Sequence, residues 1–512
     1  MLLRYGLTRG IARGVTLASL ASIVAFACGD GERTGAARVP DHTDAGAAAS
    51  GGAAGASGSS GATGGAAGAG GSAGTAGAAG ATPEAGTDAD AQAPGSIKRS
   101  TSIATSVRAA VMDIASDGIN VTLALEVWGD GEIGGKGVSL ERDNVTLVGY
   151  DGAGNYAWHR MFDAQFLQSV QLEADPAGNL YLVGIAEYIT LGSEQLRFDG
   201  DYTLFVAKLS PTGEPIWSKA FRAGFGYEWL KLGADPQGNL LISGELGAKG
   251  VDFGAGVQLA PGDGDDFYVA RLDALGNPSW IKKLTVSLPA LGIDASGASV
   301  IAGFGPNAAD LGGSAIDCPS ERTCLAAAGF DAAGNRSWLK QWVSFEPLGG
   351  SLYDLIVRPS SIFMLGTGWV DFAADGVGVS ETYLTTLDRT GAFVRGDSIS
   401  GGHEHRAAFS ASGDLYLAGT LSEYLRIGDK TLQGAATAYE QLYVAGFDAA
   451  GAVRFAKMIG KSASEVEIVG ITSTASGLAV AGNYWETLEL DRAHERRSTS
   501  GQAAAFVAFL AP

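Results

Sequence analysis

A motif of about 60 residues recurs along most of the chain, and this repetition restricts the possible folds more than any other feature. One half of the motif is an apolar run, a turn that contains glycine, and a tryptophan, as in residues 145–158 and 267–280. The other half has a similar form with an acidic start, as in residues 175–184, DPAGNLYLVG. A fold built from an array of one small unit is therefore expected. The turn glycines of the first half are Gly154, Gly213, Gly276, Gly334, Gly391 and Gly451.

Both halves predict β-hairpins, because short β-branched or aromatic runs flank a turn of the D-x-x-G-N type. Two hairpins make a four-stranded antiparallel unit, and residues 114–125 supply a seventh unit at the N-terminal end. A four-stranded sheet with two apolar faces must be covered on both, and seven units arranged radially cover one another. We therefore predict an all-β, seven-bladed β-propeller over residues 97–512. A solenoid is the structural alternative, although its repeats are usually shorter and need capped ends.

The two ends of the repeat region predict how the ring closes. The region begins with a first-strand sequence near residues 108–115 and ends with AFVAFL, residues 505–510, which matches a third strand. The last unit therefore lacks a fourth strand, and the spare segment 97–102 lies just before the first unit. We predict that this N-terminal strand completes the last blade and covers an otherwise open sheet edge.

The sequence VAKLSPTGEPIWSKAF, followed by ADPQGNLLISG and then FYVARLDALGNPSW, resembles the bacterial β-propeller repeat family known as SBBP. The resemblance covers residues 100–510 and fades in the last three units, where Arg395 and Phe455 replace the tryptophan. It implies a propeller, and proteins of this kind are often lipoproteins with low-complexity tethers. It implies no activity, because it offers no catalytic residues to transfer. We interpret the repeat tryptophans as blade-packing residues: Trp158, Trp217, Trp280 and Trp338.

The first 96 residues have a different character. Residues 1–27 predict a signal peptide, because three arginines precede an uncharged stretch that is too short to span a bilayer. Residues 28–96 are mostly Gly, Ala, Ser and Thr and predict a disordered tether. The A-x-A sequence at 25–27 suits ordinary signal peptidase, whereas the following Cys28 suits bacterial lipidation. We expect lipidation at Cys28 and an outer-membrane or cell-surface lipoprotein, with a periplasmic or secreted protein as the alternative.

The two remaining cysteines predict a local cross-link, and the net charge of the chain restricts its possible binding partners. Cys318 and Cys324 lie in a polar, loop-like run, and export to an oxidising compartment predicts a disulfide between them. A two-thiolate metal site is the alternative. The net charge of −20 argues against nucleic acid as a partner and against binding of anionic lipid through basic patches. We expect a monomer whose only membrane contact is the lipid anchor.

The connections between strands two and three are the longest, and they share one end of the propeller with the blade-to-blade connections. This end is the default functional face, because long variable loops carry most binding sites. Corresponding connections in five units carry an aromatic residue, which could stack on sugar rings or grip an envelope protein. The alternative is that each aromatic packs its connection against its own blade. These residues are Trp128, Tyr188, Trp369, Tyr424 and Trp485.

Two polar motifs predict possible metal sites. His403 and His405 begin an innermost strand near the channel mouth, and Glu228 at the aligned position of another unit is a candidate third ligand. A solvated polar loop is the alternative. The acidic run at 263–266 offers oxygen ligands for Ca²⁺, although it lacks the spacing of a known calcium loop and equally suits a solvated turn. No other cofactor is expected.

Catalytic motifs are absent from the sequence: there is no G-x-S-x-G, H-E-x-x-H, C-x-x-C or P-loop. The leading hypothesis is a non-catalytic extracytoplasmic binding or scaffold propeller, anchored by lipid, that recognises a glycan or an envelope protein. The alternative is an extracytoplasmic hydrolase or lyase that acts on a polysaccharide or peptide at the channel mouth.

Overall fold

The computed structural model describes residues 93–198, 201–223, 229–247, 249–262, 266–313, 315–346, 349–373, 382–435, 438–490, 494–497 and 502–512. The chain divides into two compact units, Met1–Gly86 and Thr87–Pro512, and all described residues belong to the second. Within these ranges no helix is long and apolar enough to cross a membrane. The predicted signal peptide and Cys28 lie outside the described residues.

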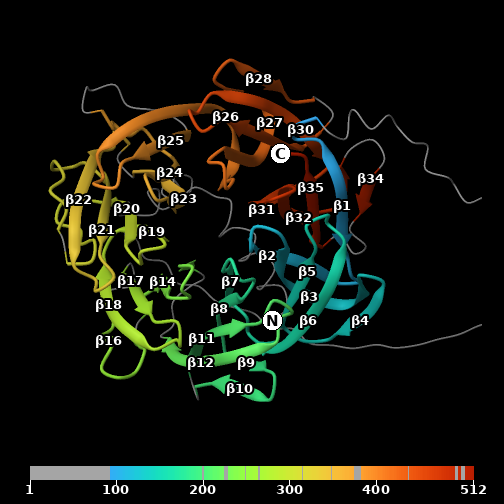
Figure 1. Ribbon diagram of the computed structural model, residues 1–512, viewed down its shortest axis with the longest axis horizontal. Coiled ribbons are helices and arrows are strands. Elements are labelled where there is room, and N and C mark those ends of the chain that lie inside the picture. The colour runs from blue at the N-terminus through green and yellow to red at the C-terminus, as the bar shows by residue number, and fades with distance from the viewer. Residues whose placement is uncertain are drawn as a thin grey trace, which may run out of the picture. The chain divides into compact units, whose positions relative to one another are not determined.

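The second unit is a seven-bladed β-propeller of four-stranded antiparallel blades (Figure 1). Blades 1 and 2 consist of β2 (Arg108–Ser116), β3 (Val121–Ile133), β5 (Asn144–Tyr150) and β6 (Tyr156–Gln165), then β7 (Ser169–Ala174), β8 (Leu180–Ala186), β11 (Tyr202–Leu209) and β12 (Pro215–Ala223). Blades 3 and 4 consist of β13 (Leu230–Ala234), β14 (Leu240–Glu245), β17 (Phe267–Leu272) and β18 (Pro278–Leu284), then β19 (Ser287–Ile293), β20 (Ser299–Gly305), β21 (Cys324–Phe330) and β22 (Arg336–Val343).

The remaining blades depart from simple succession at two points. Blade 5 consists of β23 (Ser351–Val357), β24 (Ile362–Thr367), β25 (Thr382–Leu387) and the first half of β26 (Phe393–Phe409). The second half of β26 is the inner strand of blade 6, followed by β27 (Leu415–Ile427), β29 (Glu440–Phe447) and β30 (Val453–Ser462). Blade 7 consists of β31 (Val466–Thr474), β32 (Gly477–Tyr484), β35 (Ala504–Leu510) and β1 (Ile97–Ile103).

The ring is closed at its centre. The inner strands β2, β7, β13, β19, β23, β26 and β31 contact one another in turn, and β31 contacts β2 again. Seven buried apolar clusters form the core, each between two adjacent blades. The cluster between blades 7 and 1 joins Val111 and Ile114 to Val507 and Phe509. Each blade is therefore stabilised mainly by its neighbours, as the radial arrangement predicted.

The repeated turn shows why this sequence forms hairpins. In the turn between β7 and β8, Asp175 Oδ1 accepts hydrogen bonds from the backbone N–H groups of Ala177 (3.0 Å) and Asn179 (2.9 Å). Asn179 Nδ2 donates to the other carboxylate oxygen at 2.8 Å. Gly178 has a φ of 84°, a conformation that glycine adopts at no steric cost. The D-x-x-G-N motif thus closes the hairpin through its own side chains.

The repeat tryptophans pack against the turn glycines of the next blade. A Cβ on Gly276 would lie 2.8 Å from the ring of Trp217, and Trp217 Nε1 donates to Ala274 O of the same turn at 3.2 Å. Where the tryptophan is lost, Arg395 donates to Ala450 O and Gly451 O instead. The same contact recurs as Trp158–Gly213, Trp280–Gly334, Trp338–Gly391 and Phe455–Gly95, whereas Gly154 of blade 1 is contacted by Phe509 of the third strand β35.

The long connections between second and third strands join each blade to the preceding one. The hairpin of β9 (Tyr188–Leu191) and β10 (Glu194–Arg197), which belongs to blade 2, pairs with the outer strand β6 of blade 1. Equivalent hairpins extend blades 2, 5 and 6, whereas the outer strands of blades 3 and 4, and Thr105 just after the outer strand of blade 7, carry isolated bridges. The alternative considered above was that each aromatic packs its connection against its own blade. The backbone pairing of these hairpins instead joins them to the preceding blade. These hairpins include β4 (Lys136–Leu140), β15 (Val251–Asp252), β16 (Gln258–Leu259), β28 (Lys430–Gln433), β33 (Thr487–Leu490) and β34 (His494–Arg497).

The N-terminal strand completes the last blade, as predicted. β1 pairs antiparallel with β35, with Ile97 opposite Leu510 and Ile103 opposite Ala505. The pairing continues beyond the strand, because Gly95 N donates to Ala511 O and Ala511 N donates to Ser96 O, each at 2.9 Å. Gly95, with a φ of 73°, takes the place of the turn glycine at the point where the chain is interrupted.

Candidate functional face and channel mouth

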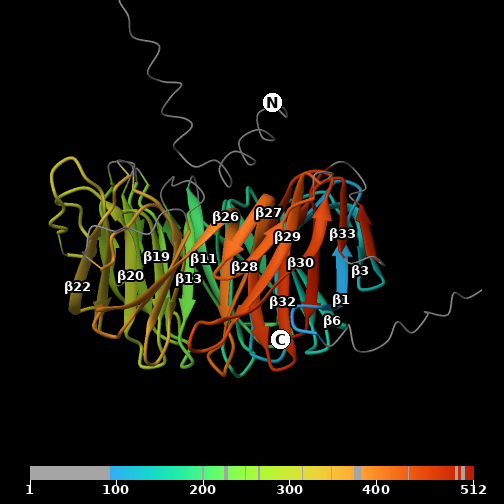
Figure 2. The same cartoon turned by 90° about the horizontal axis from the view of Figure 1, so that it is seen from above.

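The strand directions give the propeller two distinct faces (Figure 2). The connections between second and third strands lie at the same end as the blade-to-blade connections, and we call this the upper face. The D-x-x-G-N turns lie at the other end, the lower face. Inner strands start at the upper face, so their first residues surround the central axis of the ring at that face. Side chains that could meet a ligand on the longest connections therefore belong to the upper face.

The predicted aromatic residues differ in exposure. Trp369 and Tyr424 are 45% and 42% exposed, and the ring of Trp369 lies 5.3 Å from that of Phe345. Tyr188 is buried, and its hydroxyl donates to Asp163 Oδ2 of the preceding blade at 3.2 Å. The other two, Trp128 and Trp485, are half-buried.

Sequence reasoning missed Tyr439, which is 64% exposed just before β29. It lies in the same long connection of blade 6 as Tyr424, and its backbone N–H donates to Ser462 O at 3.1 Å. The position has no equivalent aromatic in the motif, so comparison of the units could not single it out. Blade 6 thus presents two exposed tyrosines at the upper face.

The two histidines predicted as metal ligands already have partners within blade 6. His403 Nε2 lies 2.8 Å from Glu440 Oε1, and its side chain is 44% exposed. His405 is fully buried, and its Nδ1 hydrogen bonds with the hydroxyl of Tyr443. Burial lowers the pKa of His405 to about 3, so this imidazole is neutral. Simple strand alternation does not hold here, because Glu404 between them has a φ of 54° and the strand register shifts.

Metal ligation therefore receives no support from the described geometry. Among the residues that the structure describes, no three His, Cys, Asp or Glu side chains are grouped so as to hold a metal ion. Glu228 lies outside the described residues, as do positions 263–265 of the acidic run. Asp266, the last residue of that run, is buried and forms an ion pair of 2.7 Å with Lys283. We assign neither histidine as a metal ligand.

Carboxylates gather around the start of β31 at the channel mouth. Burial, together with the charges of Glu467 and Glu440, raises the pKa of Glu404 to about 7 against the opposing effect of Arg406 and His403. The pKa of Glu465 is also raised by burial and by the same two neighbours. The hydrogen bond to Glu440 raises the pKa of His403 against the effect of its burial. Glu404 therefore changes its protonation state near neutral pH.

Acidic side chains also occur on the inner strands below the upper face. Asp113 of β2 accepts hydrogen bonds from Ile114 N and, across the blade boundary, from Leu172 N, each at 2.8 Å. Asp354 of β23 makes the same inter-blade contact to Ala407 N at 2.7 Å. Burial, with the charge of Asp113, raises the pKa of Glu173 to about 8, so this carboxyl group is protonated at neutral pH.

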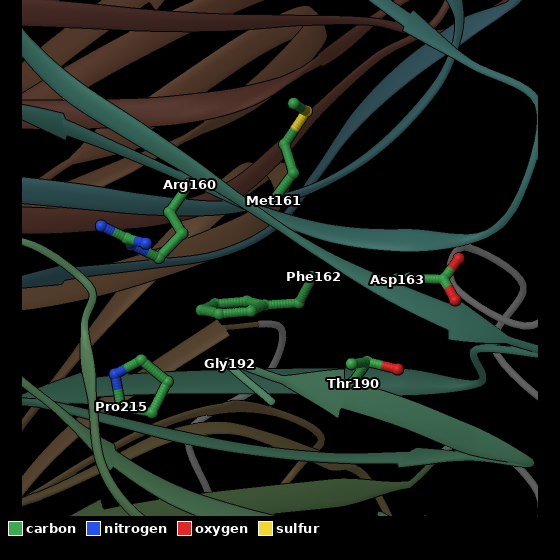
Figure 3. Close-up of a pocket in the computed structure, with 7 residues that line it drawn as sticks. All are labelled: Arg160, Met161, Phe162, Asp163, Thr190, Gly192 and Pro215. Atoms are coloured by element: carbon green, nitrogen blue, oxygen red, sulfur yellow. The ribbon is translucent and has the colours of Figure 1, made fainter. Parts of the chain in front are cut away.

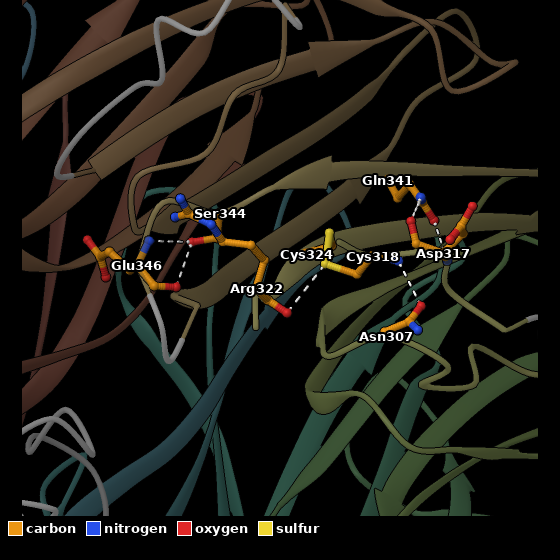
Figure 4. Close-up of a disulfide and its surroundings, with 8 residues drawn as sticks. All are labelled: Asn307, Asp317, Cys318, Arg322, Cys324, Gln341, Ser344 and Glu346. Atoms are coloured by element: carbon orange, nitrogen blue, oxygen red, sulfur yellow. Dashed lines mark hydrogen bonds between the residues drawn. A yellow bond between two sulfur atoms is a disulfide. The ribbon is translucent and has the colours of Figure 1, made fainter. Parts of the chain in front are cut away.

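The predicted disulfide is present in the connection between β20 and β21 (Figure 4). Cys318 and Cys324 are buried, with Cα atoms 5.9 Å apart. Asn307 Oδ1 accepts a hydrogen bond from Cys318 N at 3.2 Å, and Gln341 of β22 accepts one from Asp317 N at 3.0 Å. The disulfide thus fixes a loop of the upper face on blade 4.

An open hollow of about 320 Å³ lies on the outer rim between blades 1 and 2 (Figure 3). Its charged groups are already engaged, because Arg160 pairs with Glu214 and Asp163 accepts from Tyr188. We therefore assign no ligand to it. Its lining consists of Arg160, Met161, Phe162, Asp163, Thr190, Gly192 and Pro215.

Several solved structures are similar to this chain. The β-propeller domain of the Trilobed protease from Pyrococcus furiosus is similar at 13% identity, covering 77% of this chain and 99% of that chain, with a TM-score of 0.40. The Neurospora crassa Pan2 WD40 domain matches at 9% identity, 79% and 89% coverage and a TM-score of 0.32. Cobalt-substituted Synechocystis ACO matches at 12% identity, 64% and 70% coverage and a TM-score of 0.32.

No protein-family model matches the chain, and no curated protein matches its sequence. The resemblance to the SBBP family therefore stays a prediction. At these identities the structural similarity concerns architecture alone, and a propeller can serve many functions. The chain is a seven-bladed β-propeller closed by its own N-terminal strand.

Proposed function

We propose that this chain is a non-catalytic binding or scaffold propeller that recognises its partner through the aromatic residues of its upper face. The observation that carries the proposal is the exposure of Trp369, Tyr424 and Tyr439 on the face that holds the longest connections. Aromatic rings that remain exposed on one face supply large contact area to a sugar ring or a protein surface. His403 and His405, the predicted metal ligands, are engaged in hydrogen bonds within blade 6.

The proposal includes export and anchoring at Cys28. A diacylglycerol on this cysteine would hold the propeller at a membrane, and the partner would then be a glycan or a protein of the cell envelope. The strongly negative net charge is compatible with a soluble domain outside the cell. The SBBP resemblance, with its frequent lipoproteins, supports the same view.

A screen of the purified full-length chain against a glycan array and against envelope extract tests the proposal. Trp369→Ala combined with Tyr424→Ala should weaken binding about tenfold or more, as expected for central aromatic contacts. Leu275→Ala is the matched control, because Leu275 is 66% exposed but lies in a turn of the lower face. Equal loss in both variants, or none in either, would place the binding surface elsewhere.

An enzyme acting on a polysaccharide or peptide is the second candidate, and one observation favours it. Glu173 is protonated at neutral pH beside Asp113, an arrangement that a general acid requires. If the channel were catalytic, Glu173→Gln would abolish turnover of a polysaccharide or peptide substrate and leave binding at the upper face unchanged. Failure to detect any turnover by the wild type would favour the binding module.

A further inference from the structure

The crossover of β26 between blades 5 and 6 is distorted at its middle. Gly401, Gly402 and Glu404 have φ angles of 76°, 71° and 54°. The pairing register with β27 shifts twice between Gly401 and Arg406. A left-handed conformation is uncommon for a residue with a side chain, and the surrounding contacts must hold it in place. This segment is therefore a place where two backbone arrangements could compete.

The side chain of Glu440 holds the crossover against the next blade. Its Oε1 lies 2.8 Å from His403 Nε2, and its Oε2 accepts a hydrogen bond from Val466 N, also at 2.8 Å. The carboxylate is only 12% exposed. One side chain thus joins the crossover, the third strand of blade 6 and the inner strand of blade 7. Charge-assisted hydrogen bonds of this kind are stronger than neutral ones.

The charges around the crossover are unbalanced. Glu404 Oε2 is buried without a hydrogen-bond partner, and Glu467 and Glu440 are its acidic neighbours. Glu467 is held in place by Asn483 Nδ2 at 3.1 Å. The opposing cation, Arg406, donates to Val469 O and His405 O and also faces Asp354. An ionised Glu404 would therefore add a third negative charge to a site with little compensation.

We propose that this segment is a proton-dependent latch between blades 6 and 7, closed while His403 and Glu404 both carry a proton and loosened when they lose it. The protonated His403 donates to the Glu440 carboxylate, and the neutral Glu404 tolerates its unpaired, buried oxygen. Loss of both protons leaves Glu404, Glu440 and Glu467 all charged. Their repulsion then acts on the strained crossover itself.

The direction of the pH dependence follows from proton linkage. Glu404 has a pKa raised from 4.5 to about 7, so its favourable contribution is complete below pH 4.5 and is lost as the pH rises to about 7. His403 has a pKa raised from 6.5, so its contribution is complete below that value and is lost at higher pH. Glu404 therefore loosens the latch as the pH rises from 4.5 to about 7, and His403 loosens it further as the pH rises above 6.5.

Loosening of the latch would also displace residues of the upper face. The distal half of β27 pairs with the first half of β26, with Leu425 opposite Gly401, and Tyr424 is the adjacent residue. Displacement of the crossover would therefore move an aromatic residue of the binding surface. This consequence for binding rests on the proposed function, whereas the latch itself does not.

Hydrogen exchange of the full chain at pH 5 and pH 8, corrected for the intrinsic exchange rate, tests the latch. Amides of residues 399–409 and 464–470 should lose protection about tenfold or more at pH 8, since one pKa unit corresponds to a tenfold change. Amides of β11 in blade 2 should be unaffected. Glu404→Gln cannot ionise and should reduce the difference, whereas Glu214→Gln, which removes an exposed ion pair of blades 1 and 2, should leave it unchanged.

Equal protection of the wild type at both pH values would overturn the proposal, and so would a Glu404→Gln variant with the full wild-type loss. If that variant does not fold, the ring resonances of His403 in the wild type decide instead. A titration midpoint above that of an ordinary histidine supports the latch, and a midpoint at or below it refutes the latch. Neither readout involves a ligand, so failure of the proposed binding function leaves this test intact.

Discussion

One buried side chain, Asn483 of β32, forms hydrogen bonds across the boundary between the last and first blades. Its Oδ1 accepts a hydrogen bond from Val111 N at 2.7 Å, and its Nδ2 donates to Val111 O at 3.1 Å. Val111 of β2 is fully buried at a point where the register with β3 shifts. The amide of Asn483 therefore replaces a neighbouring strand as the partner of this peptide unit.

Replacement of Asn483 by alanine should leave both backbone groups of Val111 buried without a partner. At about 2 kcal/mol for each unsatisfied group, Asn483→Ala should lower the free energy of unfolding by about 4 kcal/mol. Urea denaturation followed by tryptophan fluorescence and circular dichroism measures this loss. Asn483→Asp, which keeps an acceptor but lacks the donor, should also destabilise the ring.

Thr367→Ala is the matched control for this measurement. Thr367 follows the strand-two glycine of blade 5 as Asn483 does in blade 7, is half-buried, and makes one hydrogen bond of 3.4 Å to the hydroxyl of Tyr353. Thr367→Ala should lower the free energy of unfolding by about 1 kcal/mol or less. If the two alanine variants unfold within about 1 kcal/mol of each other, the boundary is not held by Asn483 and the reasoning is wrong.

Three further predictions concern closure, anchoring and the disulfide. Deletion of residues 29–92 should leave a folded monomer, whereas deletion of 29–103 should expose the apolar edge of β35, lower the melting temperature and cause aggregation; identical melting curves would show that the ring closes elsewhere. Metabolic labelling with a tagged fatty acid should mark the wild type and not Cys28→Ser, and equal labelling of both would remove the anchor. Replacement of Cys318 and Cys324 by serine should cost roughly 2 kcal/mol in the chain-entropy model, and two free thiols in the exported protein would contradict the disulfide.

Most of the fold could be predicted because the information is local and repeated. Each hairpin contains the residues that form its own turn, so Asp175 and Gly178 predict a turn without reference to the rest of the chain. Closure was also predictable, since the missing fourth strand left β1 as its only candidate. The docking of β9 and β10 on blade 1 was not, because a four-residue strand contains no information about which blade it will join.

The candidate site was less accessible to sequence reasoning. His403 and His405 were conspicuous as a pair, yet their partners Glu440 and Tyr443 lie on another strand and show no motif. The pKa of Glu404 is raised mainly by burial and then by the charge of Glu467, which belongs to the next blade. Such contacts depend on how neighbouring blades are rotated against each other. The local sequence pattern of a blade does not indicate that rotation. The exposure of an aromatic residue, as for Trp369 against Tyr188, is decided by the same unrecorded packing.

The pairing of Ile97 with Leu510 also sets the direction in which the propeller can be held. As a fourth strand, β1 starts at the lower face, so the chain reaches the propeller at the end opposite Trp369 and Tyr424. A propeller held by its N-terminus would therefore present its aromatic connections on the face opposite the point of attachment. Pulling on the N-terminus would load the β1–β35 ladder from its Leu510 end, one hydrogen bond after another. Tension between a firmly bound partner and a held N-terminus would pass through the blades that bind the partner, and it would load the β1–β35 ladder at the point where the ring is closed.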